Sequence, residues 1–419
     1  MLRQFIRENQ HADVTQLALQ RKRYSMISDS DFRFCLQQIE GRQRTRDKLP
    51  AFAAIDGWLY PPRLNLEQCS SEQTARLKAQ LLQQFRKQQP ALRLIDATGG
   101  YGVDTFFMSE QATETHYFEQ NTELATIAQQ NFRLACKDIC CHAEPFDTTK
   151  LQAFSAHPSA LTVLYIDPSR RDAHGGRVFR LADCTPNVID IVACVRQHYT
   201  DMYLLLKLSP MLDFHQAIRE LGGIWEVYVV SIGGEVKELL LLSAPGGSQT
   251  ADGSSIARIH AVTMKDNASH LLTFTPDEES EAQVQYWQGA VNQESLAGMY
   301  VYEPDAALLK AGCFRLLSAR YGLLKAAQHT HLYLSQSPDA FRTIPASGRV
   351  WHVAGVYANA KVVQRTLARA NVLTRNYVMP ADILRKHLRF KDGGEDYIIG
   401  CRIQDKPVLL HGRLSYPMP

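Results

Sequence analysis

A carboxylate and a glycine cluster near position 100 could hold a nucleotide. The aliphatic run 92–95 ends in Asp96, and glycines follow at 99, 100 and 102. Glycine reaches positive φ without strain and leaves peptide N–H groups uncovered, so a ligand can lie against bare backbone. The pattern predicts a strand that turns sharply into a helix, with a nucleotide site at the turn.

Glu119 supplies a second carboxylate for such a site. It follows an expected strand at 116–118 and lies 23 residues after Asp96, close to the roughly 20-residue spacing of an acid that binds ribose hydroxyls. A dinucleotide fingerprint would need a glycine where Thr105 stands, so a pyrophosphate cradle is not expected. The alternative is a glycine-rich turn that only connects a strand and a helix.

The segment after a fourth expected strand, 161–166, is the candidate active site. Asp167 and Pro168 stand at the carboxyl end of this strand, where open α/β sheets bind their ligands. Asp167 could orient or deprotonate an acceptor group, and Arg170 lies in the same segment. Arg171 could clamp a phosphate or stack on a base, or it could pair with a neighbouring acid.

Lys207 and Ser209 end a fifth expected strand and are candidates for substrate binding at the same end of the sheet. For both, a structural salt bridge or a turn contact is an equal alternative. Ser209 would be a poor nucleophile without an activating histidine. Cys184, in the loop after the fourth strand, is the one thiol that could act as a nucleophile if this loop folds towards the acceptor. Whether it takes part in the reaction stays open.

The composition predicts a multidomain protein of the cytoplasm. A chain of 419 residues with 45% hydrophobic residues can form several cores. No apolar run reaches the roughly 18 residues of a membrane span, and the N-terminus lacks a signal-peptide core. The densest cysteine group, Cys136, Cys140, Cys141 and His142, lacks C-x-x-C spacing. We therefore expect reduced thiols and no metal.

The net charge of +3 is unevenly distributed. Residues 1–90 hold 15 Lys and Arg against 9 Asp and Glu, and residues 341–419 hold 13 against 5. The middle of the chain is correspondingly acidic. Such asymmetry is typical of a protein that binds a polyanion through its ends, although solvated basic helix faces give the same counts.

Hydrophobic periodicity predicts an α/β protein. Residues 1–65 look helical and basic, and strands alternate with helices from residue 92. The apolar runs 225–230 and 237–242, joined by a glycine pair, predict a hairpin beside a parallel sheet. The Gly- and Ser-rich segment 244–255 is expected to end that sheet.

Six motifs together resemble a bacterial family of class I S-adenosylmethionine (SAM) methyltransferases with a THUMP-like C-terminal domain. These motifs lie at 38–43, 67–72, 96–104, 167–171, 207–213 and 302–305. The resemblance implies a Rossmann-like sheet of seven strands with an antiparallel hairpin at one edge. It also implies four domains: an N-terminal helical domain at 1–65, the methyltransferase domain at 66–245, a ferredoxin-like domain at 256–340 and a THUMP-like domain at 341–419.

The resemblance implies SAM as the cofactor and assigns residues to it. Two of them lie at a polar helix entry, where Ser70 and Gln73 form an expected capping box that an ordinary helix start would also explain. Asp147 would lie on the adenine side. The implied cofactor residues are Gln68, Ser70, Asp96, Thr98, Gly99, Gly100, Gly102, Asp104, Glu119, Gln120 and Asp147.

The same resemblance favours methyl transfer to a base nitrogen of RNA. The segment 167–170 keeps the acid and first proline of base-amino methyltransferases but lacks their aromatic residue, and the cysteine of the pyrimidine-C5 enzymes is absent after the fifth strand. THUMP domains bind RNA, so tRNA or rRNA is the expected partner of both basic ends, without a membrane. The alternatives are a small-molecule methyltransferase and a non-catalytic RNA-binding protein that retains SAM binding.

Overall fold

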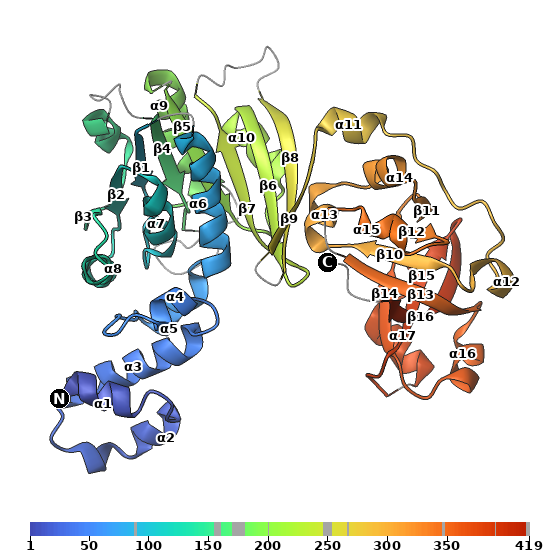
Figure 1. Ribbon diagram of the computed structural model, residues 1–419, viewed down its shortest axis with the longest axis horizontal. Coiled ribbons are helices and arrows are strands. Elements are labelled where there is room, and N and C mark those ends of the chain that lie inside the picture. The colour runs from blue at the N-terminus through green and yellow to red at the C-terminus, as the bar shows by residue number, and fades with distance from the viewer. Residues whose placement is uncertain are drawn as a thin grey trace. The chain divides into compact units, whose positions relative to one another are not determined.

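The computed structural model describes residues 1–87, 90–154, 161–169, 181–199, 201–245, 254–265, 268–345, 348–389 and 391–415. The chain forms two compact units (Figure 1). The first comprises Met1–Leu208, Leu212–Trp225 and Leu241–Ser255, and the second comprises Ser209–Met211, Glu226–Leu240 and Ile256–Pro419. Among the described residues, no helix is long and apolar enough to cross a membrane.

The N-terminal residues are helical, as expected. The helices are α1 (Leu2–Glu8), α2 (Val14–Leu19), α3 (Asp29–Thr45), α4 (Pro50–Ala53) and α5 (Arg63–Gln68), with a 3-10 turn at Arg21–Tyr24. Phe5, Phe32 and Ile39 are buried in a small core of their own. Trp58 donates a hydrogen bond to the Tyr101 hydroxyl at 2.7 Å, which ties this helical region to the glycine turn.

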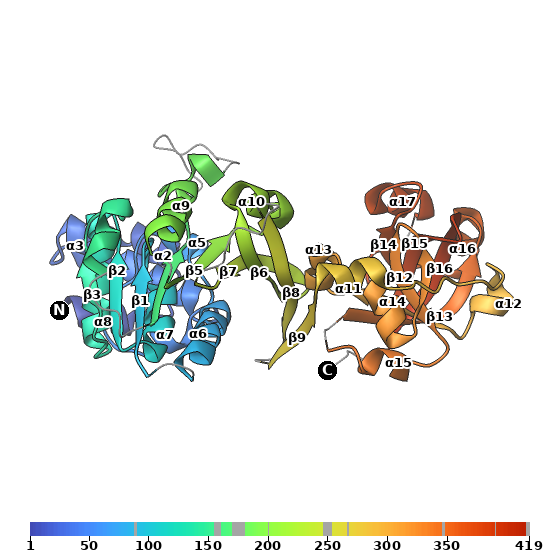
Figure 2. The same ribbon diagram turned by 90° about the horizontal axis from the view of Figure 1, so that it is seen from above.

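A large mixed sheet of nine strands contains the parallel strands that the sequence predicts. Its strands run in the order β3-β2-β1-β4-β5-β7-β6-β8-β9. Strand β1 is parallel to β2 and β4, β2 to β3, and β4 to β5, so the first five strands form the expected parallel core (Figures 1 and 2). The strands are β1 (Leu92–Asp96), β2 (Glu114–Phe118), β3 (Cys140–His142), β4 (Leu161–Ile166), β5 (Met202–Leu208), β6 (Gly223–Ile232), β7 (Glu235–Ser243), β8 (Ser254–Lys265) and β9 (Ala268–Phe274).

The expected hairpin is present, but it does not form the edge of the sheet. Strands β6 and β7 are neighbours joined only by Gly233 and Gly234, both at positive φ, so they must run antiparallel. The expectation that the sheet ends near residue 245 with seven strands is wrong, because β8 and β9 extend it to nine. Ile259 pairs with Phe274 and Ala261 pairs with Leu272, and all four are buried, so this antiparallel pair supplies an apolar face of its own.

One helix immediately precedes β1 in the sequence, and four further helices follow β1, β2, β4 and β5. They are α6 (Glu72–Arg86), α7 (Val103–Met108), α8 (Thr122–Leu134), α9 (Val188–His198) and α10 (Phe214–Leu221), with 3-10 turns at Ser109–Gln111, Thr148–Phe154 and Leu181–Asp183. Ser71 caps α6 by accepting from the Thr74 N–H at 3.2 Å. The expected cap by Ser70 is therefore wrong, since buried Ser70 donates its hydroxyl to Asp104 at 2.7 Å.

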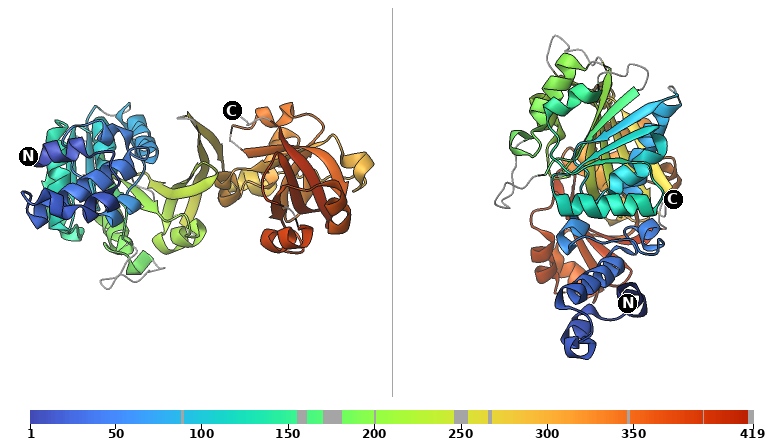
Figure 3. Two further views of the ribbon diagram at one scale, coloured as in Figure 1. Left: turned by 90° about the horizontal axis from the view of Figure 1, so that it is seen from below. Right: turned by 90° about the vertical axis from the view of Figure 1, so that its left-hand side faces the viewer.

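The second unit contains a separate sheet of seven strands in the order β11-β12-β10-β13-β16-β15-β14 (Figure 3, left). Its strands are β10 (Tyr300–Pro304), β11 (Leu324–Ala327), β12 (Thr330–Ser335), β13 (Gly348–Tyr357), β14 (Asn371–Arg375), β15 (Asp396–Ile403) and β16 (Lys406–Ser415). Buried Glu303 on β10 pairs with Arg349 on β13 at 2.5 Å and with Arg375 on β14. One carboxylate thus links three strands.

Seven short helices accompany this sheet in the described part of the chain. They are α11 (Pro276–Glu281), α12 (Gln293–Leu296), α13 (Ala306–Ala311), α14 (Arg315–Tyr321), α15 (Asp339–Arg342), α16 (Ala360–Thr366) and α17 (Ala381–Leu388). Val363 of α16 and Leu384 of α17 share a buried cluster with Val372, Ile398 and Leu409 of three strands. The last two helices therefore cover one face of β14, β15 and β16.

Candidate active site

The glycine turn after β1 is shaped by close contacts that exclude side chains. Gly100 and Gly102 have φ of 56° and 83°, values that L-residues rarely adopt. A Cβ on Gly99 would lie 2.0 Å from the Tyr117 ring, and one on Gly102 would lie 2.5 Å from Phe132. A Cβ on Gly100 would meet its nearest neighbour, the Thr98 carbonyl oxygen, only at 3.9 Å. The outer side of the turn is therefore open to a ligand.

Glu119 lies beside this turn, as its spacing predicts. It follows β2, and its carboxylate accepts hydrogen bonds from the Gly100 N–H at 2.9 Å and the Asn121 N–H at 2.7 Å. The side chain is half-buried. These contacts hold a carboxylate at the edge of the open turn.

Asp96 is buried at the carboxyl end of β1. Its carboxylate accepts hydrogen bonds from the Thr98 N–H at 3.0 Å and from the Thr105 hydroxyl. Burial raises the pKa of Asp96 to about 7, although both hydrogen bonds act in the opposite direction. Asp104 and Asp167 add further negative charge nearby.

Asp104 is the centre of a buried network of polar side chains. It pairs with Lys78 at 3.2 Å and Lys207 at 3.8 Å, and it accepts hydrogen bonds from Ser70 and Tyr165, both at 2.7 Å. Burial alone would raise the pKa of Asp104, but the two lysines and then the two hydroxyls bring it below its usual range. Asp104 is therefore a carboxylate that positions its neighbours.

Asp167 joins this network at the end of β4. Its carboxylate accepts from the Lys207 ammonium at 2.6 Å, and its backbone N–H donates to the Thr98 hydroxyl at 2.6 Å. Lys207 also donates to Ser70 at 3.0 Å. The side chain of Asp167 is 36% exposed. The structure thus brings together Asp167, Thr98, Lys207 and Ser70 from four separate segments.

Several other expected site residues differ from those above: some are exposed, and some have local contacts of their own. Gln68, Gln120 and Asp147 are exposed, and the Asp147 carboxylate accepts from the Thr149 N–H and hydroxyl. Ser209 is buried and accepts from the Met211 N–H at 3.3 Å. These contacts give each of Asp147 and Ser209 a local structural partner.

The acceptor segment beyond Asp167 is described only in part. Pro168 is buried, Ser169 is exposed, and Arg170 and Arg171 lie outside the described residues. Ser169 and Thr185 form two backbone hydrogen bonds of 2.9 and 3.1 Å, which bring the loop of Cys184 to the acceptor segment. The Cys184 thiol itself is buried.

Sequence reasoning missed Lys78, Tyr165 and Tyr117. Lys78 is fully buried although it is a lysine in the middle of a helix. A signal was available, because Lys78 lies three and four residues from the buried Ala75, Leu81 and Leu82, on the apolar face of α6. A lysine at that position needs a buried acid as its partner.

Comparisons with known proteins agree with this architecture. Two uncharacterized SAM-dependent methyltransferases, from Mycobacterium tuberculosis strains CDC 1551 / Oshkosh and ATCC 25618 / H37Rv, are each 26% identical over 370 residues, which cover 86% of this chain and 90% of each relative. The crystal structure of a candidate methyltransferase from Porphyromonas gingivalis W83 is 28% identical, with a TM-score of 0.81 over 99% of this chain and 98% of the other. Family models match a ferredoxin-like domain at 300–341 and a THUMP domain-like region at 348–414.

The strand order, the open glycine turn and these similarities define a class I methyltransferase fold. The chain is a SAM-dependent methyltransferase with C-terminal ferredoxin-like and THUMP-like domains, as the resemblance of its motifs predicts.

Replacing Lys78 with Met should destabilise the first unit by about 3–5 kcal/mol, because removing one partner of a buried ion pair leaves the other charge uncompensated. In this variant Asp104 would keep one of its two lysine partners, Lys207, at 3.8 Å. Equilibrium unfolding in urea would measure the effect. The double variant Lys78→Met/Asp104→Asn should be destabilised by less than the sum of the two single variants. A destabilisation below about 1 kcal/mol for K78M would contradict the role of this pair.

Asp96 should make folding less favourable as pH rises from 4 to 7. Its folded-state pKa of about 7 lies above the ordinary value of 3.8, so in this window the folded state keeps a proton that the unfolded state releases. Relative to Asp96→Asn, the wild-type free energy of unfolding should fall by up to about 1.4 kcal/mol per pH unit. Unfolding curves at several pH values would test this, and parallel pH profiles for the two proteins would refute it.

Proposed function

We propose that this enzyme transfers the methyl group of SAM to a base nitrogen of RNA. The observation that carries the proposal is the position of Asp167 at the end of β4. Its partly exposed carboxylate accepts from Lys207, and its backbone N–H donates to the Thr98 hydroxyl. Thr98 itself belongs to the glycine turn. An acceptor group bound to Asp167 would therefore lie next to the cofactor.

The residues around the turn fit SAM. Gly100 leaves the outer side of the turn uncovered, and Glu119 beside it would accept hydrogen bonds from the ribose hydroxyls. SAM supplies an electrophilic methyl group on a positively charged sulfur. The buried Asp96 fixes the turn through the Thr98 N–H and through Thr105 on α7.

Asp167 would act on the acceptor rather than on the cofactor. Its Oδ2 atom accepts from Lys207, and within the described residues Oδ1 has no hydrogen-bond donor. Oδ1 could accept a hydrogen bond from an amino group and take its proton as the nitrogen attacks the methyl carbon in line. The Pro168 carbonyl is a second acceptor for the same group. Lys207 holds the Asp167 carboxylate in place through the charge-assisted contact of 2.6 Å.

The C-terminal domain supports RNA as the substrate class. It matches a THUMP domain-like family model, and residues 341–419 carry 13 Lys and Arg against 5 Asp and Glu. The exposed cations on α16, α17 and the segments after them are Lys361, Arg365, Arg369, Lys386, Arg389 and Lys391. We name these six residues the α16/α17 cations. Lysine and arginine side chains so exposed can contact phosphates without breaking an internal ion pair.

Replacing Asp167 with Ala or Asn should lower the rate of methyl transfer by about 10²–10⁴-fold, as expected when the group that orients and deprotonates the acceptor is removed. SAM affinity should stay near that of the wild type, because Asp167 does not form the glycine turn. The measurement is transfer of tritiated methyl from SAM to tRNA, to rRNA and to small metabolites, all from cells that lack the gene. Calorimetric titration with SAM measures the cofactor affinity of the wild type and the variants.

Label in one RNA fraction, absent with D167A, would establish both the substrate class and the role of Asp167. Label only in the metabolite pool would identify a small-molecule methyltransferase instead. Full activity of D167A, or simultaneous loss of SAM binding, would refute the role assigned to this carboxylate. SAM binding without label in any pool would favour the non-catalytic alternative.

The α16/α17 cations should contribute to RNA affinity by neutralising phosphates. The triple variant Arg365→Gln/Lys386→Gln/Arg389→Gln should bind RNA more weakly, and the slope of log affinity against log salt should decrease by about one for each phosphate that is no longer neutralised. Fluorescence anisotropy with unfractionated tRNA at several salt concentrations would measure both quantities.

A matched control removes the same charge from cations that already have partners. Arg342 pairs with Asp339, Arg402 donates to the Asp405 carbonyl, and Arg413 pairs with Asp396. The variant with all three replaced by Gln should keep the wild-type salt slope. Equal slopes for the two triple variants would show that only overall charge matters.

A further inference from the structure

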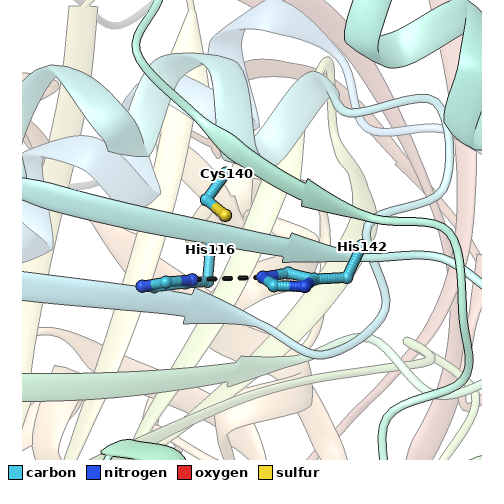
Figure 4. A group of neighbouring side chains, drawn as sticks. All are labelled: His116, Cys140 and His142. Carbon is cyan, nitrogen blue, oxygen red and sulfur yellow. Dashed lines mark hydrogen bonds between the residues drawn. The ribbon is translucent and has the colours of Figure 1, made fainter.

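Three side chains of metal-ligand type meet where β2 and β3 pair. His116 lies on β2, and Cys140 and His142 lie on β3. The strands are parallel, with His116 opposite Cys140 and Phe118 opposite His142. Alternate residues of paired strands share a face of the sheet, so all three side chains project to the same side. One ligand atom from each lies within 4.8 Å of the other two (Figure 4).

The distance between the two imidazoles suits a shared metal ion. His116 Nδ1 and His142 Nε2 are 3.2 Å apart, and Figure 4 shows the two rings directed edge to edge with the Cys140 sulfur beside them. Two nitrogens bound tetrahedrally to one zinc ion at 2.0–2.1 Å lie about 3.3–3.4 Å from each other. To bind zinc, each ring would turn so that its nitrogen points at the ion instead of at the other ring, and the exposed Cys140 side chain would move closer.

Neighbouring residues already hold both rings in place. The other nitrogen of His116, Nε2, lies 2.8 Å from Glu114 Oε1, and Arg93 donates to the second oxygen of Glu114 at 2.7 Å. A carboxylate bonded to the outer nitrogen of a histidine is the usual support of a zinc-binding imidazole. The His142 ring stacks on Phe118 with centroids 4.2 Å apart and an interplanar angle of 9°.

We propose that His116, Cys140 and His142 form a zinc-binding site with an open fourth position. A set of two imidazoles and one thiolate favours Zn²⁺ over Mg²⁺ or Ca²⁺, which prefer oxygen ligands. The proposal departs from the expectation of no metal, which considered only the spacing of residues 136–142. His116 is 24 residues before Cys140 in the sequence, and only the pairing of β2 with β3 brings it to the cluster.

Zinc at this position would stabilise the edge strand β3, which pairs with the strand that precedes Glu119. Strand β3 has three residues and pairs only with β2 among the described strands. The N–H of Glu119, the proposed ribose ligand, donates to the His142 carbonyl at 3.1 Å. The metal would therefore stabilise the strand that supports Glu119, while its ligands lie apart from Asp167 and the residues proposed to bind the acceptor.

The test is a competition titration of the metal-free full-length protein with Zn²⁺ against a chromophoric chelator. We expect one high-affinity equivalent per chain in the wild type. Cys140→Ser and His142→Ala should each weaken binding by at least about 10–100-fold, the range measured when even the supporting partners of a zinc ligand are removed. Substitution with Co²⁺ should give the visible spectrum of a tetrahedral ion with one thiolate, and this spectrum should disappear in C140S.

The matched control is Cys141→Ser, which changes the adjacent thiol of the same strand. Cys141 lies on the opposite side of the strand, with its Sγ 3.6 Å from the Ile139 carbonyl oxygen, so C141S should bind zinc as the wild type does. Circular dichroism would verify that each variant is folded. Equal zinc affinity in C140S and C141S, or failure of the wild type to compete with the chelator, would overturn the proposal. Zinc binding is measured without methyl transfer, so the result of this test does not depend on whether the proposed function is correct.

Discussion

The ionised Asp104 carboxylate in the interior of the first unit is the interaction on which the site depends. Lys78 from α6 and Lys207 from β5 both pair with it, and Ser70 and Tyr165 donate hydrogen bonds to it. A buried carboxylate without such partners would be costly. Charges therefore alternate from Lys78 through Asp104 and Lys207 to Asp167. The partly exposed acid at the acceptor position is held by a chain of contacts anchored in the core.

Two buried acids near the glycine turn show how partners decide ionisation. Asp96 and Asp104 are both almost inaccessible to water. The carboxylate of Asp96 accepts hydrogen bonds only from neutral donors among the described residues, and burial raises its pKa to about 7. Asp104 has two lysines, and its pKa is lowered. The residue type alone could not have separated these outcomes, because the difference comes from cations that lie far away in the sequence.

Features that are determined by local backbone geometry can be predicted from the sequence. A Cβ at Gly99 or Gly102 would collide with a buried aromatic ring, and the positive φ of Gly100 favours glycine, so the strand, turn and helix can be recognised from the spacing of these glycines. The position of Glu119 at that turn follows from the alternation of strands and helices. The hairpin around Gly233 and Gly234 is recognisable for the same local reason.

Features that depend on pairing between distant segments cannot be predicted in this way. The sequence around Ser70 predicts a helix cap, but a buried acid 34 residues later binds its hydroxyl. The large sheet extends further than its sequence pattern predicts, because β8 and β9 follow a segment rich in Gly and Ser that resembles a domain linker. The cluster around His116 depends on the register of β2 against β3, which the sequence does not specify for a strand of three residues.

The basic residues named at the two ends of the chain also differ in the contacts that they form. In the N-terminal helices, Arg7, Arg21 and Arg44 pair with acids. Arg42 and Lys48 donate to backbone carbonyls at 2.8 Å. These five cations therefore stabilise the helical region and are less available to phosphates. The α16/α17 cations are exposed on helices whose apolar residues are already buried against the sheet. The excess of basic over acidic residues, six at 1–90 and eight at 341–419, is thus partly taken up by internal partners at the N-terminal end. The proposed RNA contact is therefore assigned to the α16/α17 cations.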